Sequence, residues 1–242
     1  MMLGLGGCER QPEPASPSPG EEQPPDVPEL PTEPTTPLHP ALVAHVQAQI
    51  LPAVAEVPAE RRVELARLAT FVSERGLAKQ SADLTFICTH NSRRSQMAQV
   101  WAAAAAAWFG VDAVRSFSGG TEATAFNPRA VAALRRAGFE LESGPGDNPR
   151  VRVGLGPQGP ELLCHSKRFG DAPNPKEGFA AVMTCSAADK SCPTVSGAAL
   201  RVGLPYEDPK VADDTPGEAA RYDARSQQIA AEMFYLMSLV RG

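Results

Sequence analysis

The sequence is poor in aromatic residues, in cysteine and in long apolar runs. Aromatic residues make up 6% of its 242 residues, and five residues are cysteine. No apolar run approaches the roughly 18–20 residues that cross a membrane. The net charge is −5 and the lysines and arginines are scattered, so nothing indicates nucleic-acid binding. The length suffices for one ordinary α/β domain with additional segments.

Residues 9–40 lack the apolar side chains that a packed core needs. They hold eleven of the chain's 24 prolines, seven acidic residues and a single basic residue, Arg10. Such a segment cannot bury enough apolar surface to offset the entropy lost on ordering it. We therefore predict that residues 1–40 form a disordered, extended N-terminal segment.

The first eight residues leave the location of the protein open. The sequence LGGC at residues 5–8 resembles a bacterial lipoprotein box, in which the cysteine is acylated after cleavage. A charged n-region and an apolar stretch of about 7–15 residues do not precede it. We expect a cytoplasmic protein; the alternative is a cell-envelope lipoprotein anchored through Cys8, if the true start lies upstream.

Residues 41–80 have the apolar spacing of helices. One apolar stripe occupies residues 42–51 and a second occupies residues 63–72, with a break at Val57-Pro58. This helical lead-in is predicted to be two helices that cover the main domain and carry no chemistry of their own.

Strand and helix signals alternate over residues 81–242. Strands are expected at residues 84–87, 114–118, 179–184 and 199–204. Helices are expected after the first strand, from Asn127-Pro128 to Arg136, and from a capping box at Thr215 to about Val240. The alternation predicts an α/β three-layer sandwich, a four-stranded parallel sheet with helices on both faces. Ligands of such sheets bind outside the carboxyl ends of the strands.

Residues 141–178 interrupt this alternation with dense proline and glycine. Two short strands, at residues 150–153 and 161–165, predict an inserted hairpin near the site. Lys167 and Arg168 follow the hairpin, and we expect them on the solvated surface rather than on the substrate.

The sequence CTHNSRRS, from Cys88 to Ser95, carries the strongest chemical signal. It lies between a predicted strand and a predicted helix, so loop N–H groups and the helix N-terminus converge on one spot and favour negative charge there. The same field favours a thiolate, and we expect Cys88 to be a nucleophile near neutral pH. The planar fork of Arg94 suits a tetrahedral oxyanion. The residues expected to bind that oxyanion are Thr89, His90, Asn91, Ser92, Arg93 and Arg94.

Two further cysteines and a carboxylate follow the third and fourth strands. Cys185 and Cys192, seven residues apart, are either incidental thiols or a redox pair that attacks an adduct at Cys88 and resolves the disulfide. A metal site is not favoured, since no CxxC pair or neighbouring histidine pair is present. Asp208, before Pro209, is a candidate general acid, preferred to Glu207.

Residues 83–240 resemble the low-molecular-weight phosphotyrosine phosphatase superfamily, and most of all its thioredoxin-coupled arsenate reductase branch. The segments that carry the resemblance are CTHNSRRSQMAQ, SGGTEATAFNPRAVAAL, MTCSAADKSCP and YEDP. The resemblance implies Cys88 as nucleophile, Ser95 as a hydroxyl that stabilises its thiolate, and Asp208 as general acid. It also implies that Cys185 and Cys192 relay a disulfide outward.

Three departures from the family pattern bear on function. His90 stands where the family usually has a glycine, so we expect a histidine at positive φ, at some cost. Gln99 replaces a glutamate that helps to bind potassium in some reductases, and no such site is expected. Lys210 stands where eukaryotic-type phosphatases carry a substrate-stacking tyrosine, which counts against a phosphotyrosine-protein substrate.

The favoured hypothesis is a monomeric arsenate reductase without cofactor or metal, whose partners are a small oxyanion and thioredoxin. A phosphatase that hydrolyses phosphomonoesters through a phosphocysteine at Cys88 is the first alternative. A non-catalytic oxyanion-binding module that is tethered to a membrane, and that would not depend on the thiol, is the second.

Overall fold

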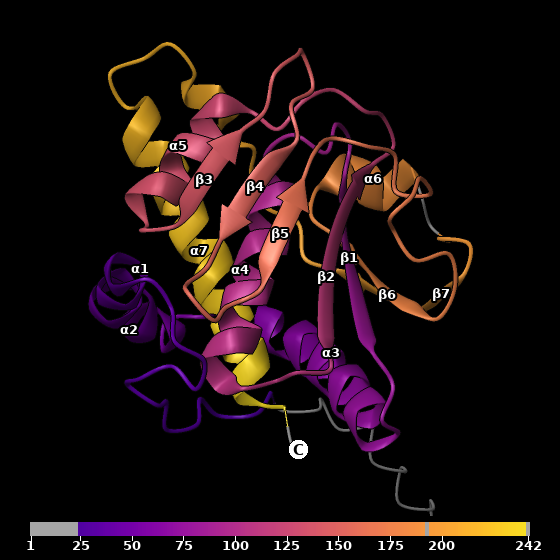
Figure 1. Ribbon diagram of the computed structural model, residues 1–242. Helices are drawn as coiled ribbons and strands as arrows, with labels where there is room; N and C mark the ends of the chain where they lie inside the picture. Colours follow the sequence, from indigo (N-terminus) through magenta and orange to yellow (C-terminus); the bar gives the residue numbers. More distant parts are fainter. Residues whose placement is uncertain (1–23, 192–193, 241–242) are drawn as a thin grey trace, which may run out of the picture.

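The computed structural model describes residues 24–191 and 194–240, without the side chain of Ser191. Its centre is a four-stranded parallel sheet in the order β2-β1-β6-β7 (Figure 1). The strands are β1 (Ala82–Cys88), β2 (Val114–Gly120), β6 (Phe179–Met183) and β7 (Ala198–Gly203). The predicted α/β class with a parallel sheet is therefore confirmed. In this register Cys88 lies opposite Gly120, and Ile87 opposite Met183, so these strand ends share one edge.

The two faces of the sheet are covered unequally. Leu84, Phe86 and Val182 point into a large core shared with the long helices. Ile87, Met183 and their neighbours form a smaller cluster on the opposite face of the sheet. The helices of the larger layer are α3 (Ala59–Leu77), α4 (Arg94–Phe109), α5 (Pro128–Arg136) and α7 (Glu218–Ser238). The short helix α6 (Ser186–Ser191) contacts β1 and β6 beside the smaller cluster.

Helix α4 is buried along nearly its whole length, from Ser95 to Trp108. It contacts β1 and β2 on one side and α7 on the other. The alanine tract at residues 102–107 lets both neighbours approach closely, and alanine has the highest helix propensity. The helix ends at Gly110, whose φ of 67° suits glycine. Because α4 packs on both sides, its first turn is fixed in place next to Cys88.

The lead-in is a helix with a π turn, followed by a second, longer helix. Helix α1 (Pro40–His45), the π turn η1 (Val46–Ile50) and α2 (Leu51–Val54) follow one another without a break. Pro58 then precedes α3, as the Val57-Pro58 break predicts. Helices α2 and α3 both contact α7.

The prediction of a disordered segment up to residue 40 is wrong for residues 24–40. Leu38 is 6% exposed and belongs to the core. The Thr35 amide donates to the Trp108 carbonyl at 2.9 Å, and the Tyr235 hydroxyl donates to the Pro25 carbonyl at 2.6 Å. Contacts with distant residues thus order an extended chain whose composition alone indicates disorder. Residues 1–23, with Cys8, lie outside the described residues.

The insertion folds as a three-stranded antiparallel sheet, in the order β3-β4-β5. Its strands are β3 (Glu140–Ser143), β4 (Val151–Gly154) and β5 (Glu161–Cys164). The predicted hairpin is therefore present, with β3 added to it. Arg168 is exposed as expected, but Lys167 is only 5% exposed, so the prediction of a solvated Lys167 is wrong. Burial lowers the pKa of Lys167.

The predicted capping box does not form at the start of α7. The helix begins at Glu218, and Thr215 donates its hydroxyl to the Ala212 carbonyl at 2.7 Å instead. Ala212 is the last residue of the 3₁₀ turn η2 (Pro209–Ala212), so the threonine hydroxyl binds this turn and does not cap α7. In the part of the chain that the structure describes, no helix is both long and apolar enough to cross a membrane.

Candidate active site

Cys88 ends β1, at the edge of the sheet where the strands finish. Its thiol is nearly buried, with the residue 3% exposed. Six residues later α4 begins at Arg94, so the thiol lies at the first turn of a 16-residue helix. The positive end of the helix dipole and the free N–H groups of that turn stabilise an anion at this place.

A hydroxyl is aimed at the Cys88 sulfur. The sulfur lies 3.1 Å from the Ser95 Oγ, and that oxygen accepts a hydrogen bond from the Asn91 side-chain amide at 2.9 Å. Because the amide occupies an acceptor site of the hydroxyl, the hydroxyl proton is available to the sulfur. The arrangement suits a thiolate at Cys88.

The positive φ of the loop falls on Asn91, not on His90. Asn91 has φ 46°, whereas His90 is not among the described residues with positive φ. Asparagine is enriched severalfold in this region. The expectation of a strained histidine is therefore wrong, and the loop needs no glycine at residue 90.

The end of the insertion supports the loop from behind. The Lys167 amide donates to the Asn91 Oδ1 at 2.9 Å, and the Ser166 hydroxyl donates to the His90 carbonyl at 2.9 Å. Thr124 adds a second hydroxyl to that carbonyl at 3.0 Å. Sequence reasoning missed Ser166, because no local pattern links it to residues 76 positions earlier.

Arg94 joins the loop to the segment that carries Asp208. Its Nη1 donates to the Tyr206 carbonyl at 3.0 Å, and its Nη2 donates to the Asp208 Oδ2 at 2.7 Å. Its Nε is buried and has no hydrogen-bond partner among the residues described. A guanidinium has five N–H groups, so donors remain for an oxyanion beside Cys88.

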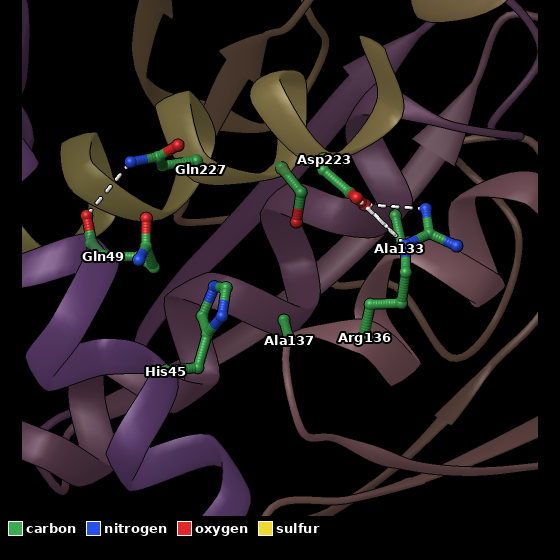
Figure 2. Close-up of a pocket in the computed structure, with 8 residues that line it drawn as sticks. His45, Gln49, Ala133, Arg136, Ala137, Asp223 and Gln227 are labelled. Atoms are coloured by element: carbon green, nitrogen blue, oxygen red, sulfur yellow. Dashed lines mark hydrogen bonds and ion pairs between the residues drawn. The ribbon is translucent and has the colours of Figure 1, made fainter. Parts of the chain in front are cut away.

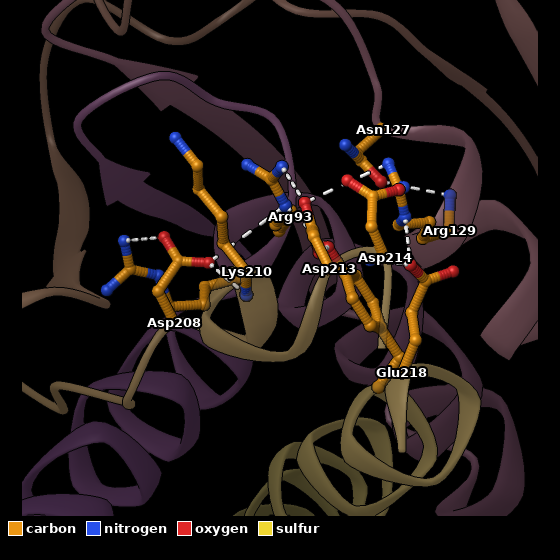
Figure 3. Close-up of polar contacts among 10 residues, drawn as sticks. Arg93, Asn127, Arg129, Asp208, Lys210, Asp213, Asp214 and Glu218 are labelled. Atoms are coloured by element: carbon orange, nitrogen blue, oxygen red, sulfur yellow. Dashed lines mark hydrogen bonds and ion pairs between the residues drawn. The ribbon is translucent and has the colours of Figure 1, made fainter. Parts of the chain in front are cut away.

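The side chain of Arg93 does not join this oxyanion site. Its Nε donates to the Tyr222 hydroxyl at 2.7 Å, and its Nη2 donates to Asp213 at 3.2 Å (Figure 3). Burial, and then the hydrogen bond to Asp213, raise the pKa of Tyr222 to about 12. Figure 3 shows Arg93 between Asp208 and a second cluster of charges around Arg129. If Arg93 binds the oxyanion, it does so through its backbone N–H and not through its side chain.

Cys185 lies beside the same loop, just after β6. Its sulfur is 3.5 Å from the Thr89 Oγ1 and accepts from the Ala188 amide at 3.3 Å. Cys185 is buried and shares the smaller apolar cluster with Cys88. Cys192 lies outside the described residues. The structure thus brings Cys185 to the Cys88 loop.

The thiol of Cys164 differs from these two. It is fully buried, and burial raises its pKa to about 12 although Lys167 nearby opposes the shift. Within residues 24–191 and 194–240, no three His, Cys, Asp or Glu side chains gather as a metal site would require.

A polar cavity of about 350 Å³ lies apart from these residues, between the lead-in, α5 and α7. Figure 2 shows His45 and Gln49 from the lead-in facing Asp223 and Gln227, with Arg136 paired to Asp223 at its side. Cys88, Arg94 and Asp208 do not line this cavity. It is therefore not part of the oxyanion site.

Comparisons with known proteins place the chain in a family. A sequence profile described as low molecular weight phosphotyrosine protein phosphatase matches residues 83–147. An arsenate reductase of Brevibacillus brevis is 31% identical over 124 residues, which cover 51% of this chain and 74% of that protein. The chain belongs to the low-molecular-weight phosphotyrosine phosphatase superfamily. Within this superfamily, the chain falls in the arsenate reductase branch.

Other members of the superfamily are similar as well. An arsenate reductase of Staphylococcus epidermidis is 28% identical over 124 residues, 51% of this chain and 76% of that protein. The solved low molecular weight phosphotyrosine phosphatase of Vibrio cholerae covers 64% of this chain and 94% of its own, at 14% identity and a TM-score of 0.42. The profile match and the Brevibacillus brevis relative show that the chain is an enzyme of the low-molecular-weight phosphatase superfamily.

Proposed function

We propose that the chain is an arsenate reductase in which Cys88 and Cys185 together supply two electrons to arsenate. The observation that carries this proposal is the place of the Cys185 sulfur, 3.5 Å from the Thr89 hydroxyl of the Cys88 loop. A phosphatase needs one thiol here, whereas a reductase needs a second thiol within reach of the first.

In the first step the Cys88 thiolate attacks the arsenic atom of arsenate and an S–As bond forms. The Ser95 hydroxyl, 3.1 Å from the sulfur, holds the thiolate beforehand. The loop N–H groups and the unpaired N–H groups of Arg94 bind the arsenate oxygens. Asp208, at the Arg94 fork, gives a proton to the oxygen that leaves as water.

In the second step the Cys185 thiolate attacks the Cys88 sulfur. An S–S bond forms while the S–As bond breaks, and its electron pair stays on arsenic, which leaves as arsenite. Two thiolates are thereby oxidised to a disulfide and As(V) is reduced to As(III). The Ala188 amide, which donates to the Cys185 sulfur at 3.3 Å, stabilises the attacking thiolate.

In the last step Cys192 takes over the disulfide. Its thiolate attacks the Cys185 sulfur and releases Cys88, which leaves a Cys185–Cys192 disulfide for thioredoxin to reduce. A reducing partner of this kind is found in the cytoplasm, so the mechanism favours a cytoplasmic protein over an anchored one.

A phosphatase remains the alternative, since Cys88, Arg94 and Asp208 would serve a phosphocysteine intermediate equally well. The deciding experiment supplies the purified chain with arsenate, thioredoxin, thioredoxin reductase and NADPH, and follows NADPH oxidation and arsenite. We expect turnover that is lost in Cys185→Ser and kept in Cys164→Ala, the matched control for a buried thiol outside the site. Hydrolysis of 4-nitrophenyl phosphate without reductant, unchanged in Cys185→Ser and without arsenite formation, would instead establish the phosphatase.

A further inference from the structure

A buried ion pair joins the lead-in to the last helix. Arg61, in the first turn of α3, donates from Nε and Nη2 to the two carboxylate oxygens of Glu232 on α7, at 2.5 and 2.6 Å. The Glu232 side chain is 1% exposed. A carboxylate so deeply buried depends on its partners, because an unpaired charge there is strongly unfavourable.

The same ion pair holds Tyr206. The Tyr206 hydroxyl donates to the Glu232 Oε2 at 2.7 Å, and the Arg61 guanidinium lies 4.8 Å above the centre of the tyrosine ring. Arg61 also donates from Nη1 to the Pro205 carbonyl at 3.1 Å. Helices α3 and α7 therefore bind both the side chain of Tyr206 and the backbone carbonyl of the residue before it.

The backbone of Tyr206 faces the active site. Its carbonyl accepts from the Arg94 Nη1, and the Arg94 Nη2 donates to Asp208, two residues further along. The position of the Asp208 carboxylate relative to the arginine thus follows from where Tyr206 lies. The contacts run from Arg61 through Glu232 and Tyr206 to Arg94, which binds both the Tyr206 carbonyl and the Asp208 carboxylate.

We propose that Arg61 is a positioning residue for the Asp208 segment, acting through Glu232 and Tyr206. The proposal rests on the proposed function of the Cys88 site, in which Asp208 is the general acid. It gives the lead-in a part in catalysis, in contrast to the inert cover that the sequence predicts. As a positioning residue it acts only through the side chains and the backbone carbonyl that it contacts.

The Tyr206 hydroxyl remains a hydrogen-bond donor over the pH range in which the enzyme would be assayed. Burial, and then the negative charge of Glu232, raise the pKa of Tyr206 well above its usual range. The hydroxyl therefore keeps its proton near neutral pH, and Tyr206→Phe removes one defined hydrogen bond while the Arg61–Glu232 pair stays in place.

The test is a double-mutant cycle in the full chain, with arsenate turnover under thioredoxin as the readout. The single variants are Tyr206→Phe, Arg61→Lys and Asp208→Asn, and the double variants combine each of the first two with Asp208→Asn. Arg67→Gln is the control, since Arg67 lies on the same helix and its ion pair, with Glu64, is at the surface. Iodoacetate alkylation of Cys88 is measured on every variant, as a reading of the loop itself.

We expect Tyr206→Phe to lower kcat about tenfold with KM nearly unchanged, because a misplaced general acid loses part of its contribution of about 10²–10⁴. In the Asp208→Asn background the same change should cost less than about twofold. Arg61→Lys should behave in the same way with a smaller effect, and Arg67→Gln should turn over normally. Alkylation of Cys88 should stay within about twofold of wild type in all variants.

Equal losses in both backgrounds would show a general structural effect and overturn the proposal, as would unchanged turnover in Tyr206→Phe. A large fall in Cys88 alkylation would place the effect at the loop and overturn it as well. If the wild-type chain fails to reduce arsenate but hydrolyses 4-nitrophenyl phosphate, the proposed reductase fails. The same cycle on the ester then supports or overturns the positioning of Asp208 on its own.

Discussion

At the scale of single residues, Asn91 organises the Cys88 loop. Its side chain donates to Ser95 and accepts from the Lys167 amide, and its carbonyl accepts from Gln96 at 3.1 Å. Its positive φ turns the chain within the loop. One asparagine thus fixes the backbone of the loop and the hydroxyl that faces the thiol. The rate at which the Cys88 thiol reacts therefore reports directly on the arrangement of this loop.

We predict that Cys88 is alkylated by iodoacetate at about pH 6 at least about tenfold faster than Cys164, because the loop stabilises its thiolate. Phosphate or arsenate should slow the reaction by occupying the loop. Burial raises the pKa of Cys164 to about 12, so that thiol is the internal reference. Mass spectrometry of digests gives both rates, and equal rates would refute the assignment of the loop.

Arg94→Lys should lower arsenate turnover by at least about 100-fold, although the charge is kept. An ammonium cannot make the parallel hydrogen bonds of a guanidinium to an oxyanion. It also cannot hold the Tyr206 carbonyl and Asp208 together, as Arg94 does. Steady-state kinetics test this, with Arg67→Lys on α3 as the control. Near wild-type turnover of Arg94→Lys would place Arg94 outside the site.

At the scale of elements, the end of β2 packs tightly against the Cys88 loop. A Cβ added at Gly120 would lie 2.2 Å from the Glu122 carbonyl oxygen, and in the loop 2.6 Å from the Thr89 carbonyl oxygen and 2.8 Å from the Asn91 nitrogen. All three neighbours are backbone atoms, which cannot rotate away as a side chain can. The glycine therefore permits the close approach that lets strand and loop share one edge.

Gly120→Ala should lower the free energy of unfolding by about 2 kcal/mol or more, and slow Cys88 alkylation, because the loop must shift to admit the methyl group. The control is Gly170→Ala, since a Cβ there meets nothing within 4 Å. Denaturant unfolding and alkylation rates are measured on both variants. If the two glycine variants behave alike, the tight packing of the loop on β2 is wrong.

Elements with strong local signals are predictable from the sequence, and elements shaped by distant partners are not. The strand before Cys88 and the helix opened by Asn127, whose side chain accepts from the Arg129 amide at 2.9 Å, follow from local patterns. The capping box at Thr215 fails because a neighbouring turn uses the hydroxyl. Lys167 is buried because its segment docks on the Cys88 loop, which no local pattern reveals.

At the scale of the whole molecule, the helical lead-in and residues 24–39 are packed into the main core. Trp108 accepts a backbone hydrogen bond from Thr35, and its indole donates to the Pro31 carbonyl at 3.0 Å. Composition indicated disorder for this segment, because proline-rich chains lack apolar area of their own. The order comes from α4 and α7, whose partners lie more than 70 residues away in sequence.

We predict that acid weakens the packing of the lead-in. Burial lowers the pKa of His45, which stacks on Trp101 with ring centres 6.1 Å apart, and Asp223 opposes the shift only in part. Below about pH 6.5 the unfolded chain binds a proton that the folded chain resists, so stability falls as the pH falls. The denaturant midpoint should drop more between pH 7.5 and 5.5 for wild type than for His45→Gln. Identical drops would show that His45 does not contribute.

The Cys192→Ser variant tests the proposed thiol relay most directly. With Cys192 absent, the attack of Cys185 on the Cys88 adduct still occurs, but nothing resolves the disulfide. After arsenate is added, mass spectrometry of a non-reduced digest should show one Cys88–Cys185 disulfide and one arsenite per chain, with turnover stopped. Repeated arsenate turnover by Cys192→Ser under thioredoxin, with no Cys88–Cys185 disulfide, would contradict the relay.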